Sequence, residues 1–266
     1  MQKKLFNKFT AIAMTDVGLV REHNEDSILI DEQLGLLVVA DGMGGHQAGE
    51  IASKEAIAII QQMLRLQQRA FKNKGWLARL FDNFKQASID INEKTLNIEK
   101  ALVEANKHIY QLNIERESSI GSGMGTTIAG CQLISADMML VFHIGDSRVY
   151  RFRNQQLQML TKDHSALQGW HDDGCEGDRP KANVILRAVG PYPEVEADTQ
   201  LVKLNEGDSF LICSDGLTDM LNDQQIEKVM QDLAEDQLQV YSQSLLNLAL
   251  EQGGQDNVSI ILIAGK

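Results

Sequence analysis

The sequence predicts an α+β fold in which antiparallel sheets form a sandwich of layers and the helices pack on the outside. The expected elements occur in blocks along the chain: strands, two helices, many strands, further helices and a last strand. The strands of the long middle block are short and separated by turn residues, which is typical of an antiparallel meander. A doubly wound parallel sheet would need strands and helices in regular alternation, and that alternation is absent.

The N-terminal quarter is expected to form three strands, over residues 9–14, 27–31 and 34–40. Residues 36–40 are continuously apolar, as in a strand that is buried on both faces. Two helices should follow, because apolar residues recur at steps of three and four on one face of each. These faces consist of Ala48, Ala52, Ala56, Ile59, Met63 and Leu66, and of Ile98, Leu102, Ala105, Ile109 and Leu112.

The second half of the chain contributes the other expected strands, over residues 126–133, 138–144, 148–153, 157–160, 184–189, 199–204, 209–213 and 258–263. Residues 162–181 are rich in Gly and Asp and predict an irregular surface loop. Asn222, with Gln225 three residues later, is typical of a helix N-cap. A last helix is expected to end at Gly253 and Gly254. Its apolar face carries Leu238, Tyr241, Leu245 and Leu248.

The composition is that of a globular protein, and the net charge disfavours some classes of binding partner. The chain has 266 residues, of which 43% are hydrophobic and 23% charged, and it suits a single domain over residues 1–266. Lys and Arg total 25 against 37 Asp and Glu, a net charge of −12. Nucleic acid and anionic membrane surfaces are disfavoured, because both attract basic faces. No apolar run approaches the ~18 residues of a membrane span, so none is expected.

Cysteine usage bears on the cellular compartment. Cys131, Cys175 and Cys213 are widely spaced and odd in number. They fit neither a disulfide framework nor a zinc site, which favours a reducing, cytoplasmic location. No apolar stretch follows the lysines at the N-terminus, so no secretory signal is expected.

Acidic residues fall at the ends of the expected strands. Asp41, Asp146 and Asp215 each follow an apolar strand, while Glu25 and Asp256 each precede one. Carboxylates brought together repel one another unless a cation neutralises them. Oxygen ligands without a Cys or His cluster favour Mg²⁺ or Mn²⁺ over zinc. The alternative is that each Asp-Gly pair forms an ordinary turn, which is a common role of this dipeptide.

Three further residues near these acids are candidates for the site. The glycine at Gly42 lets the backbone approach closely, so its carbonyl can also be a ligand. Arg21 can grip a phosphate group with two hydrogen bonds, or it can form a salt bridge with Glu22, Glu25 or Asp26. His46 follows a glycine-rich turn and can donate a proton to a leaving group. The other histidines are expected to be ordinary surface residues: His23, His108, His143, His164 and His171.

Segments along almost the whole chain together resemble the protein phosphatase 2C family of metal-dependent Ser/Thr phosphatases, in its compact bacterial form. They occur in the order in which the family has them. The matching stretches are 15–18 with Arg21 and 24–26, 39–46 with 48–50, 123–127, 144–148, 161–165, 183–190, 214–219 and 254–257. The resemblance implies a central antiparallel β-sandwich flanked by pairs of α-helices, in four αββα layers.

The resemblance also implies a centre that holds two Mn²⁺ or Mg²⁺ ions, with a third ion more weakly bound. On this reading Asp41 bridges the two ions, and Arg21 and His46 are the phosphate-binding residue and the general acid. The remaining ligands implied are Asp215 and Asp256 on one ion, Glu25 and the Gly42 carbonyl on the other, and Asp146 and Asp219 with Asp215 on the third.

The activity implied is hydrolysis of phosphoserine and phosphothreonine on proteins, in which a metal-bridging hydroxide attacks phosphorus in one step. Such an enzyme would be a signalling protein that opposes a cognate Ser/Thr kinase, and nothing in the chain demands more than a monomer. Two alternatives stay open. A catalytically silent phosphoprotein-binding regulator is disfavoured, because no ligand acid is missing. A phosphatase of small phosphoesters is not excluded.

Two segments depart from the family pattern. The flap, residues 162–183, lacks the usual leucine-rich and Ile-Thr-containing pattern and looks shorter, which puts substrate choice in doubt. Residues 67–93 form a longer connection than usual. They place Trp76, Leu77, Leu80, Phe81 and Phe84 at helical spacing among Arg69, Lys72, Lys74, Arg79 and Lys85. An amphipathic helix packed on its own domain is favoured over a helix that docks a partner or touches a membrane.

Overall fold

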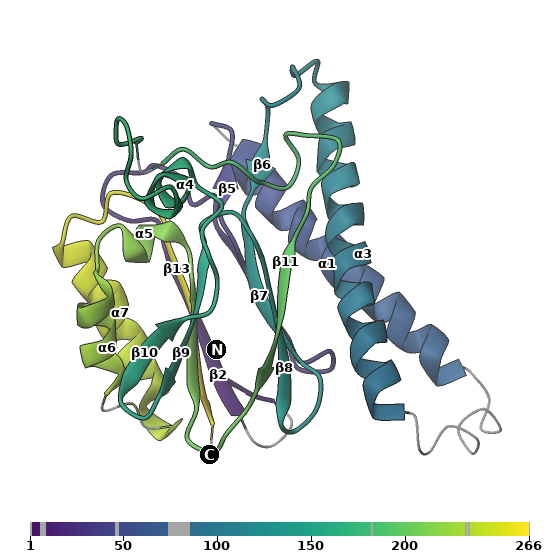
Figure 1. Ribbon diagram of the computed structural model, residues 1–266, viewed down its shortest axis with the longest axis vertical. Coiled ribbons are helices and arrows are strands. Elements are labelled where there is room, and N and C mark those ends of the chain that lie inside the picture. The colour runs from purple at the N-terminus through teal and green to yellow at the C-terminus, as the bar shows by residue number, and fades with distance from the viewer. Residues whose placement is uncertain are drawn as a thin grey trace.

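The computed structural model describes residues 2–5, 9–45, 48–73, 86–181, 183–231, 233 and 235–265, and two antiparallel sheets lie face to face at its centre (Figure 1). The six-stranded sheet has the order β1 (Gln2–Leu5), β2 (Phe9–Asp16), β13 (Val258–Gly265), β12 (Ser209–Cys213), β9 (Arg148–Arg153) and β10 (Gln156–Met159). The five-stranded sheet has the order β11 (Asp198–Lys203), β8 (Met138–Ile144), β7 (Ile128–Leu133), β4 (Leu36–Ala40) and β3 (Ser27–Asp31). The short strands β5 (Gly42–Met43) and β6 (Gly125–Thr126) pair with each other.

Helices cover the outer face of each sheet, which completes the four layers seen in Figure 1. The long helices α1 (Ala48–Asn73) and α3 (Gln86–Glu115) pack on the five-stranded sheet. The six-stranded sheet is covered by α5 (Asp215–Thr218), α6 (Asp223–Met230), η1 (Glu235–Gln237) and α7 (Leu238–Glu251). The predicted fold class is therefore confirmed. Within the described part of the chain, no helix has both the length and the apolar composition needed to cross a bilayer.

The alternation of side chains along the strands builds three apolar layers. In β4, Val39 points between the two sheets, while its neighbour Val38 points under α1 and α3. Because successive residues of a strand face opposite sides, a strand with a buried layer on each face must be apolar throughout. This is why residues 36–40 form an uninterrupted apolar run. The third layer lies between the six-stranded sheet and α6 and α7, around Leu211 and Leu245.

Several expected elements are confirmed and others are wrong. The capping box of Asn222 and Gln225 is present at the start of α6. Residues 184–189 do not form a strand, because only two isolated bridges, at Ile185 and Val189, involve them. Leu66 does not lie on the buried face of α1, since it is 51% exposed.

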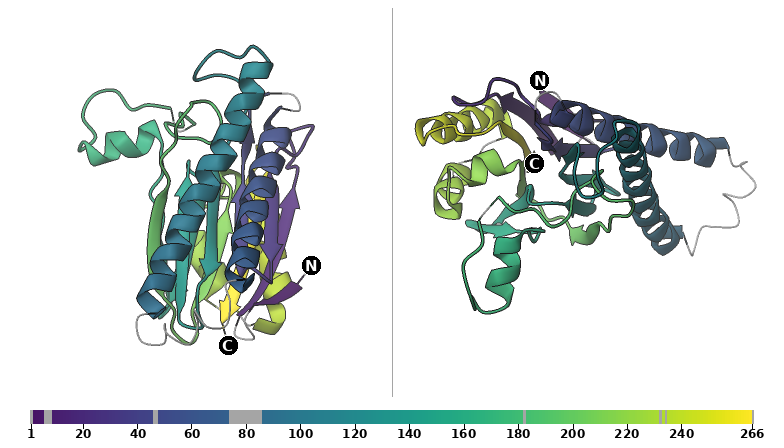
Figure 2. Two further views of the ribbon diagram at one scale, coloured as in Figure 1. Left: turned by 90° about the vertical axis from the view of Figure 1, so that its right-hand side faces the viewer. Right: turned by 90° about the horizontal axis from the view of Figure 1, so that it is seen from above.

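The flap is not wholly irregular, because it contains the helix α4 (Ala166–Asp172). Ser165 caps this helix by accepting a hydrogen bond from the Gln168 amide, and none of its residues is buried. Figure 2 shows α4 standing away from the sheets. The helix has only seven residues, and its three apolar residues, Ala166, Leu167 and Trp170, are too few to establish a periodic pattern in the sequence.

The longer connection predicted at residues 67–93 is only partly described. Residues 67–73 complete α1 and residues 86–93 begin α3. The five aromatic and leucine residues of its expected apolar face lie outside the described residues.

Candidate active site

The predicted acidic residues come together at one end of both sheets, the upper end in Figure 1. Asp41 and Asp146 follow β4 and β8 of the five-stranded sheet, while Asp215 follows β12 and Asp256 precedes β13 of the other sheet. The negative charges of these groups raise one another's pKa, so they lie close together. Because each is attached to the end of a buried strand, the fold holds them in place before any ligand binds.

Asp41 lies at the middle of this cluster. Its backbone amide donates to the Thr127 hydroxyl at 3.1 Å, and its carbonyl accepts from the Thr127 amide at 2.8 Å. Burial and the neighbouring charges of Asp26 and Asp215 raise the pKa of Asp41 well above its usual value. The Asp41 and Asp215 carboxyl groups lie close enough together for each to influence the pKa of the other.

The pKa values of the surrounding carboxyl groups are also raised. Burial, followed by the charge of Asp215, raises the pKa of Asp26 and of Asp146 to about 7 in each case. Burial raises the pKa of Asp215 to about 6, and it also raises the pKa values of Glu25 and Asp219. Without a cation, Asp26, Asp146 and Asp215 therefore compete for protons near neutral pH.

Several carboxylate oxygens of the cluster are buried without a hydrogen-bond partner among the described residues. They are Glu25 Oε1, Asp26 Oδ1, Asp146 Oδ1 and Asp215 Oδ1. A buried polar atom that is left unpaired is costly, so four of them in one place indicate a missing partner. The donor set contains only oxygen, which fits a hard divalent cation such as Mn²⁺ or Mg²⁺.

Gly42 occupies a position that has no room for a side chain. A Cβ atom there would lie 2.2 Å from the Gly49 carbonyl oxygen and 2.5 Å from that of Glu25. Glu25 is held in turn by its amide, which donates to Asn257 Oδ1 at 2.8 Å, and by its carbonyl, which accepts from Ser53 Oγ at 2.6 Å. The predicted pair, Glu25 and the Gly42 backbone, is thus brought together.

Arg21 lies at the open side of the cluster. Its Nη2 atom donates to Asp256 Oδ2 at 2.6 Å, and its side chain is 52% exposed. This hydrogen bond is the main cause that raises the pKa of Arg21. The alternative salt bridges, to Glu22, Glu25 or Asp26, are not among the ion pairs of the described residues. Arg21 instead contacts an acid that lies 235 positions away in the sequence.

Comparison with known proteins shows the family of the chain. Residues 20–251 match the family described as protein phosphatase 2C. The chain belongs to this family. The phosphatase is 32% identical over 259 residues to "Serine/threonine phosphatase stp" of Listeria monocytogenes, which covers 94% of this chain and 93% of the relative.

Solved structures of similar proteins agree with the fold. PppA, a regulatory component of the type VI secretion system (T6SS) in Pseudomonas aeruginosa, superposes on the phosphatase with a TM-score of 0.78. It is 28% identical, and the match covers 97% of this chain and 98% of that one. The catalytic domain of PstP in complex with two manganese ions gives a TM-score of 0.75 at 31% identity, over 97% and 98% of the two chains.

The structure bears on the predictions for three histidines of the phosphatase. His46, the predicted general acid, lies outside the described residues. The expectation that His143 and His164 are ordinary surface residues is wrong, because they are only 4% and 9% exposed. Their rings stack with centroids 4.5 Å apart. His143 lies in a strand and His164 directly after the start of the flap, so no pattern in the sequence placed them together.

Asp26 lies in the acidic cluster, although the sequence did not predict it as a ligand. It is 8% exposed and accepts a hydrogen bond from Ser214 Oγ at 2.9 Å. Its position between Glu25 and a strand was a visible signal, but only its charge effect on Asp41 reveals that it faces the cluster.

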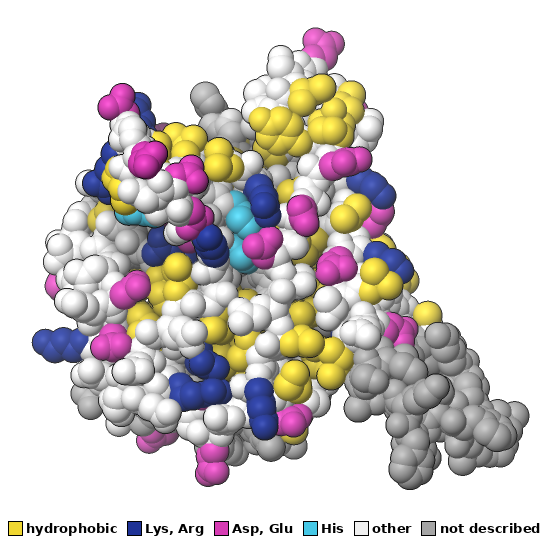
Figure 3. Space-filling view, viewed as in Figure 1, with side chains coloured by type: hydrophobic (Ala, Val, Ile, Leu, Met, Phe, Trp, Pro, Cys, Tyr) yellow, Lys and Arg dark blue, Asp and Glu magenta, His cyan; other side chains and the backbone are white. Residues whose placement is uncertain are grey.

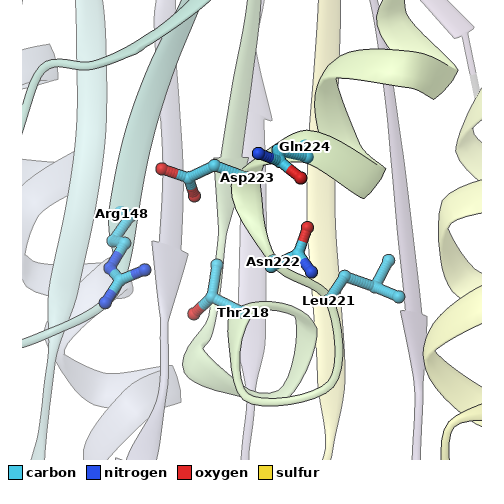
Figure 4. A pocket seen from close by; sticks show the side chains of 6 residues that line it. All are labelled: Arg148, Thr218, Leu221, Asn222, Asp223 and Gln224. Carbon is cyan, nitrogen blue, oxygen red and sulfur yellow. The ribbon is translucent and has the colours of Figure 1, made fainter.

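A pocket of about 530 Å³ is lined by Arg148 and by residues 218 and 221–224 (Figure 4). Arg148 stands on one side, and the end of α5, the start of α6 and the connection between them lie on the other. Thr218 is next in sequence to Asp219, so the pocket begins where the cluster ends.

Proposed function

We propose that this phosphatase hydrolyses phosphoserine and phosphothreonine on proteins with two divalent cations held in the acidic cluster. The observation that carries the proposal is the set of buried carboxylate oxygens without partners, which suits hard cations. The relatives are named serine/threonine phosphatases, and PstP is described with two manganese ions. The enzyme is accordingly a metal-dependent protein-serine/threonine phosphatase.

The proposed ligands follow from the placement of the acids. Asp41 would contact both cations, since it lies at the middle of the cluster. Asp215 and Asp256 would hold one cation, and Glu25 with the Gly42 carbonyl the other. A third, weaker cation would be held by Asp146 and Asp219 together with Asp215. Mn²⁺ and Mg²⁺ both suit this donor set, because each accepts oxygen ligands.

The reaction divides into a contribution from the ions and contributions from side chains. When bound in the cluster, divalent cations would withdraw charge from the phosphoryl group and would make hydroxide available near neutral pH. Arg21 leaves Asp256 and donates to two phosphate oxygens, which stabilises charge on the transferring group. The P–O bond to the seryl or threonyl oxygen breaks as the oxygen of a hydroxide ion forms a bond to phosphorus, and His46 protonates the departing oxygen.

The proposed setting of the enzyme is a signalling circuit in the cytoplasm, where it would oppose a Ser/Thr kinase as a monomer. The free thiols support a reducing compartment, since Cys131 and Cys213 are buried and Cys175 is exposed, all unpaired. The net charge of −12 supports phosphoprotein rather than nucleic-acid partners.

Metal removal tests this function directly. With Mn²⁺ or Mg²⁺, the protein is expected to release phosphate from a phosphothreonine peptide, and excess chelator should abolish this release. Glucose 6-phosphate and a nucleoside monophosphate, assayed in parallel, distinguish a protein phosphatase from a phosphatase of small phosphoesters. Binding of the phosphopeptide without turnover at any metal concentration would contradict the proposal and indicate a silent regulator.

Removal of the Arg21 side chain should weaken phosphate binding. Arg21→Ala is expected to lower kcat/KM for the phosphopeptide about tenfold or more, because hydrogen bonds between charged groups contribute roughly 1.5–3 kcal/mol. The inhibition constant of inorganic phosphate should rise in parallel, and Arg21→Lys should recover only part of the loss. Arg69→Ala, at an exposed position of α1, is the matched control. Unchanged phosphate inhibition in Arg21→Ala would remove the phosphate-binding role.

A further inference from the structure

His143 and His164 form a buried cluster behind the acidic centre that the proposed mechanism does not use. The rings stack at an interplanar angle of 22°. Asp198, the cross-strand partner of His143 at the start of β11, lies 3.4 Å from His164 Nε2 through its Oδ2 atom. Figure 3 shows histidine side chains on this face between acidic and basic ones.

The ligand atoms of His143, His164 and Asp198 lie within 4.8 Å of one another, but the hydrogen bonds do not suit a metal ion. The Gly145 amide donates to His164 Nδ1 at 3.1 Å, so Nδ1 carries the lone pair and the ring proton is on Nε2. A histidine that binds a metal donates a proton from its other nitrogen instead. Arg187 Nη1 also lies 3.3 Å from Nε2, where a cation would have to be.

The same hydrogen bonds tie His164 to the turn that carries Asp146. The His164 amide donates to the Gly145 carbonyl at 2.9 Å, so backbone and ring together hold Gly145 from both sides. Gly145 has a φ of 107°, and a Cβ atom there would lie 2.7 Å from Thr127 Cβ. The turn therefore depends on glycine and on partners outside it for its shape.

A second contact holds the chain on the C-terminal side of Asp146. Asp163, the residue before His164, binds the Arg148 guanidinium with two hydrogen bonds of 2.9 and 2.6 Å. Between these two attachments, Ser147 Oγ lies 2.7 Å from Thr127 Oγ1, which also accepts from the Asp41 amide. The turn that contains Asp146 is therefore held on one side by His164 and Asp163 of the flap. On the other side it is held by Thr127, which also contacts the Asp41 amide.

We propose that His164 is a positioning residue, whose Nδ1 acceptor holds the Gly145–Asp146 turn so that the Asp146 carboxylate is aimed at the third cation. His143 orients the ring, because it stacks on it and is itself fixed by donation from Nε2 to the Lys162 carbonyl at 2.8 Å. The inference rests on the proposed function, since it takes Asp146 as a ligand of the weaker cation.

Two amide substitutions test this role. In His164→Asn, the Oδ1 atom lies near the place of Nδ1 and can still accept from Gly145, whereas the longer side chain in His164→Gln reaches towards Asp198 instead. The 266-residue chain is titrated with Mn²⁺, and electron paramagnetic resonance follows the free ion. The weakest class of sites should bind Mn²⁺ about tenfold more weakly in His164→Gln and His164→Ala. The two tighter sites should be unchanged. His164→Asn should bind Mn²⁺ nearly as the unsubstituted protein does.

The controls separate this inference from the assignment of Asp146. His108→Asn, at a residue that pairs with Glu55 at 3.1 Å on the far side of the five-stranded sheet, should leave all classes of site unchanged. If Asp146→Asn loses the weakest class but His164→Gln does not, the inference alone is wrong. If neither variant changes Mn²⁺ binding, both the third-cation assignment and the inference are wrong. Equal loss in His164→Asn and His164→Gln would also overturn it, because the acceptor would then not matter.

Discussion

Asp41→Asn is expected to reduce metal-dependent turnover by about 10³-fold or more, while the metal-free protein stays folded. Asp41 lies at the middle of the cluster close to Asp215, and in the proposed ligand set its carboxylate would contact both cations. An amide offers one neutral oxygen and cannot neutralise two ions, and the electrostatic stabilisation that they provide in the transition state would be lost with them.

The same substitution should make the metal-free protein more stable, and this separates loss of function from loss of fold. Burial and repulsion raise the pKa of Asp41, so removal of its charge relieves an unfavourable interaction. Phosphate release and thermal unfolding after chelation are the measurements. Asp137→Asn, at an exposed position of the β7–β8 hairpin, is the matched control and should change neither. Full activity in Asp41→Asn would contradict the proposed ligand set.

The metal-free protein is expected to lose stability as the pH rises from about 6.5 to 8. The pKa values of Asp26 and Asp146 are raised to about 7, and that of Asp41 is raised well above its usual value. The folded state therefore binds more protons than the unfolded chain, whose aspartates ionise near pH 4. Stability that depends on these protons is present at low pH and is lost as the pH rises through the folded pKa values.

Between about pH 6.5 and 8, the two buried histidines have little effect on the pH dependence of stability, although at lower pH they act in the opposite direction. Burial lowers the pKa values of His143 and His164, which makes stability rise with pH, but only below about 6.5. Above about pH 6.5, each proton that the acidic cluster releases should lower the melting temperature by roughly 3 °C per pH unit.

Calorimetry in chelator measures this slope, and Asp41→Asn should flatten it. With saturating Mn²⁺ the slope should reverse, because ions and protons compete for the same oxygens. A metal-free protein that becomes more stable from pH 6.5 to 8 would contradict the raised pKa values.

The sequence predicted most of the fold because the core strands and helices are strongly periodic. The expected ranges for β3, β8, β9 and β12 agree with the structure to the residue. The wrong predictions concern segments in which apolar residues do not show whether the chain joins a sheet. Val184 and Leu186 are apolar but 42% and 59% exposed, because the chain there crosses the surface rather than joining a sheet.

The candidate site was predictable as far as its residues occupy strand ends. A buried strand followed by an acid is visible in the sequence, whereas the direction of a flexible side chain is not. The contact of Arg21 with Asp256 joins two ends of the chain, and the stacking of His143 on His164 depends on how the flap returns to β8. Such long-range pairings are set by tertiary packing, so no local pattern reveals them.

The acids of the cluster belong to both sheets, and this has a consequence beyond catalysis. A cation that contacts Asp41 and Asp215 joins the end of β4 to the end of β12, and so acts as a cross-link between the two halves of the sandwich. Ligands that bind only the folded state stabilise it in proportion to their concentration. In a cell starved of manganese and magnesium, the sheets would separate more often at this end and expose the chain to proteases. The amount of phosphatase, and not only its rate, would then follow the supply of divalent metal.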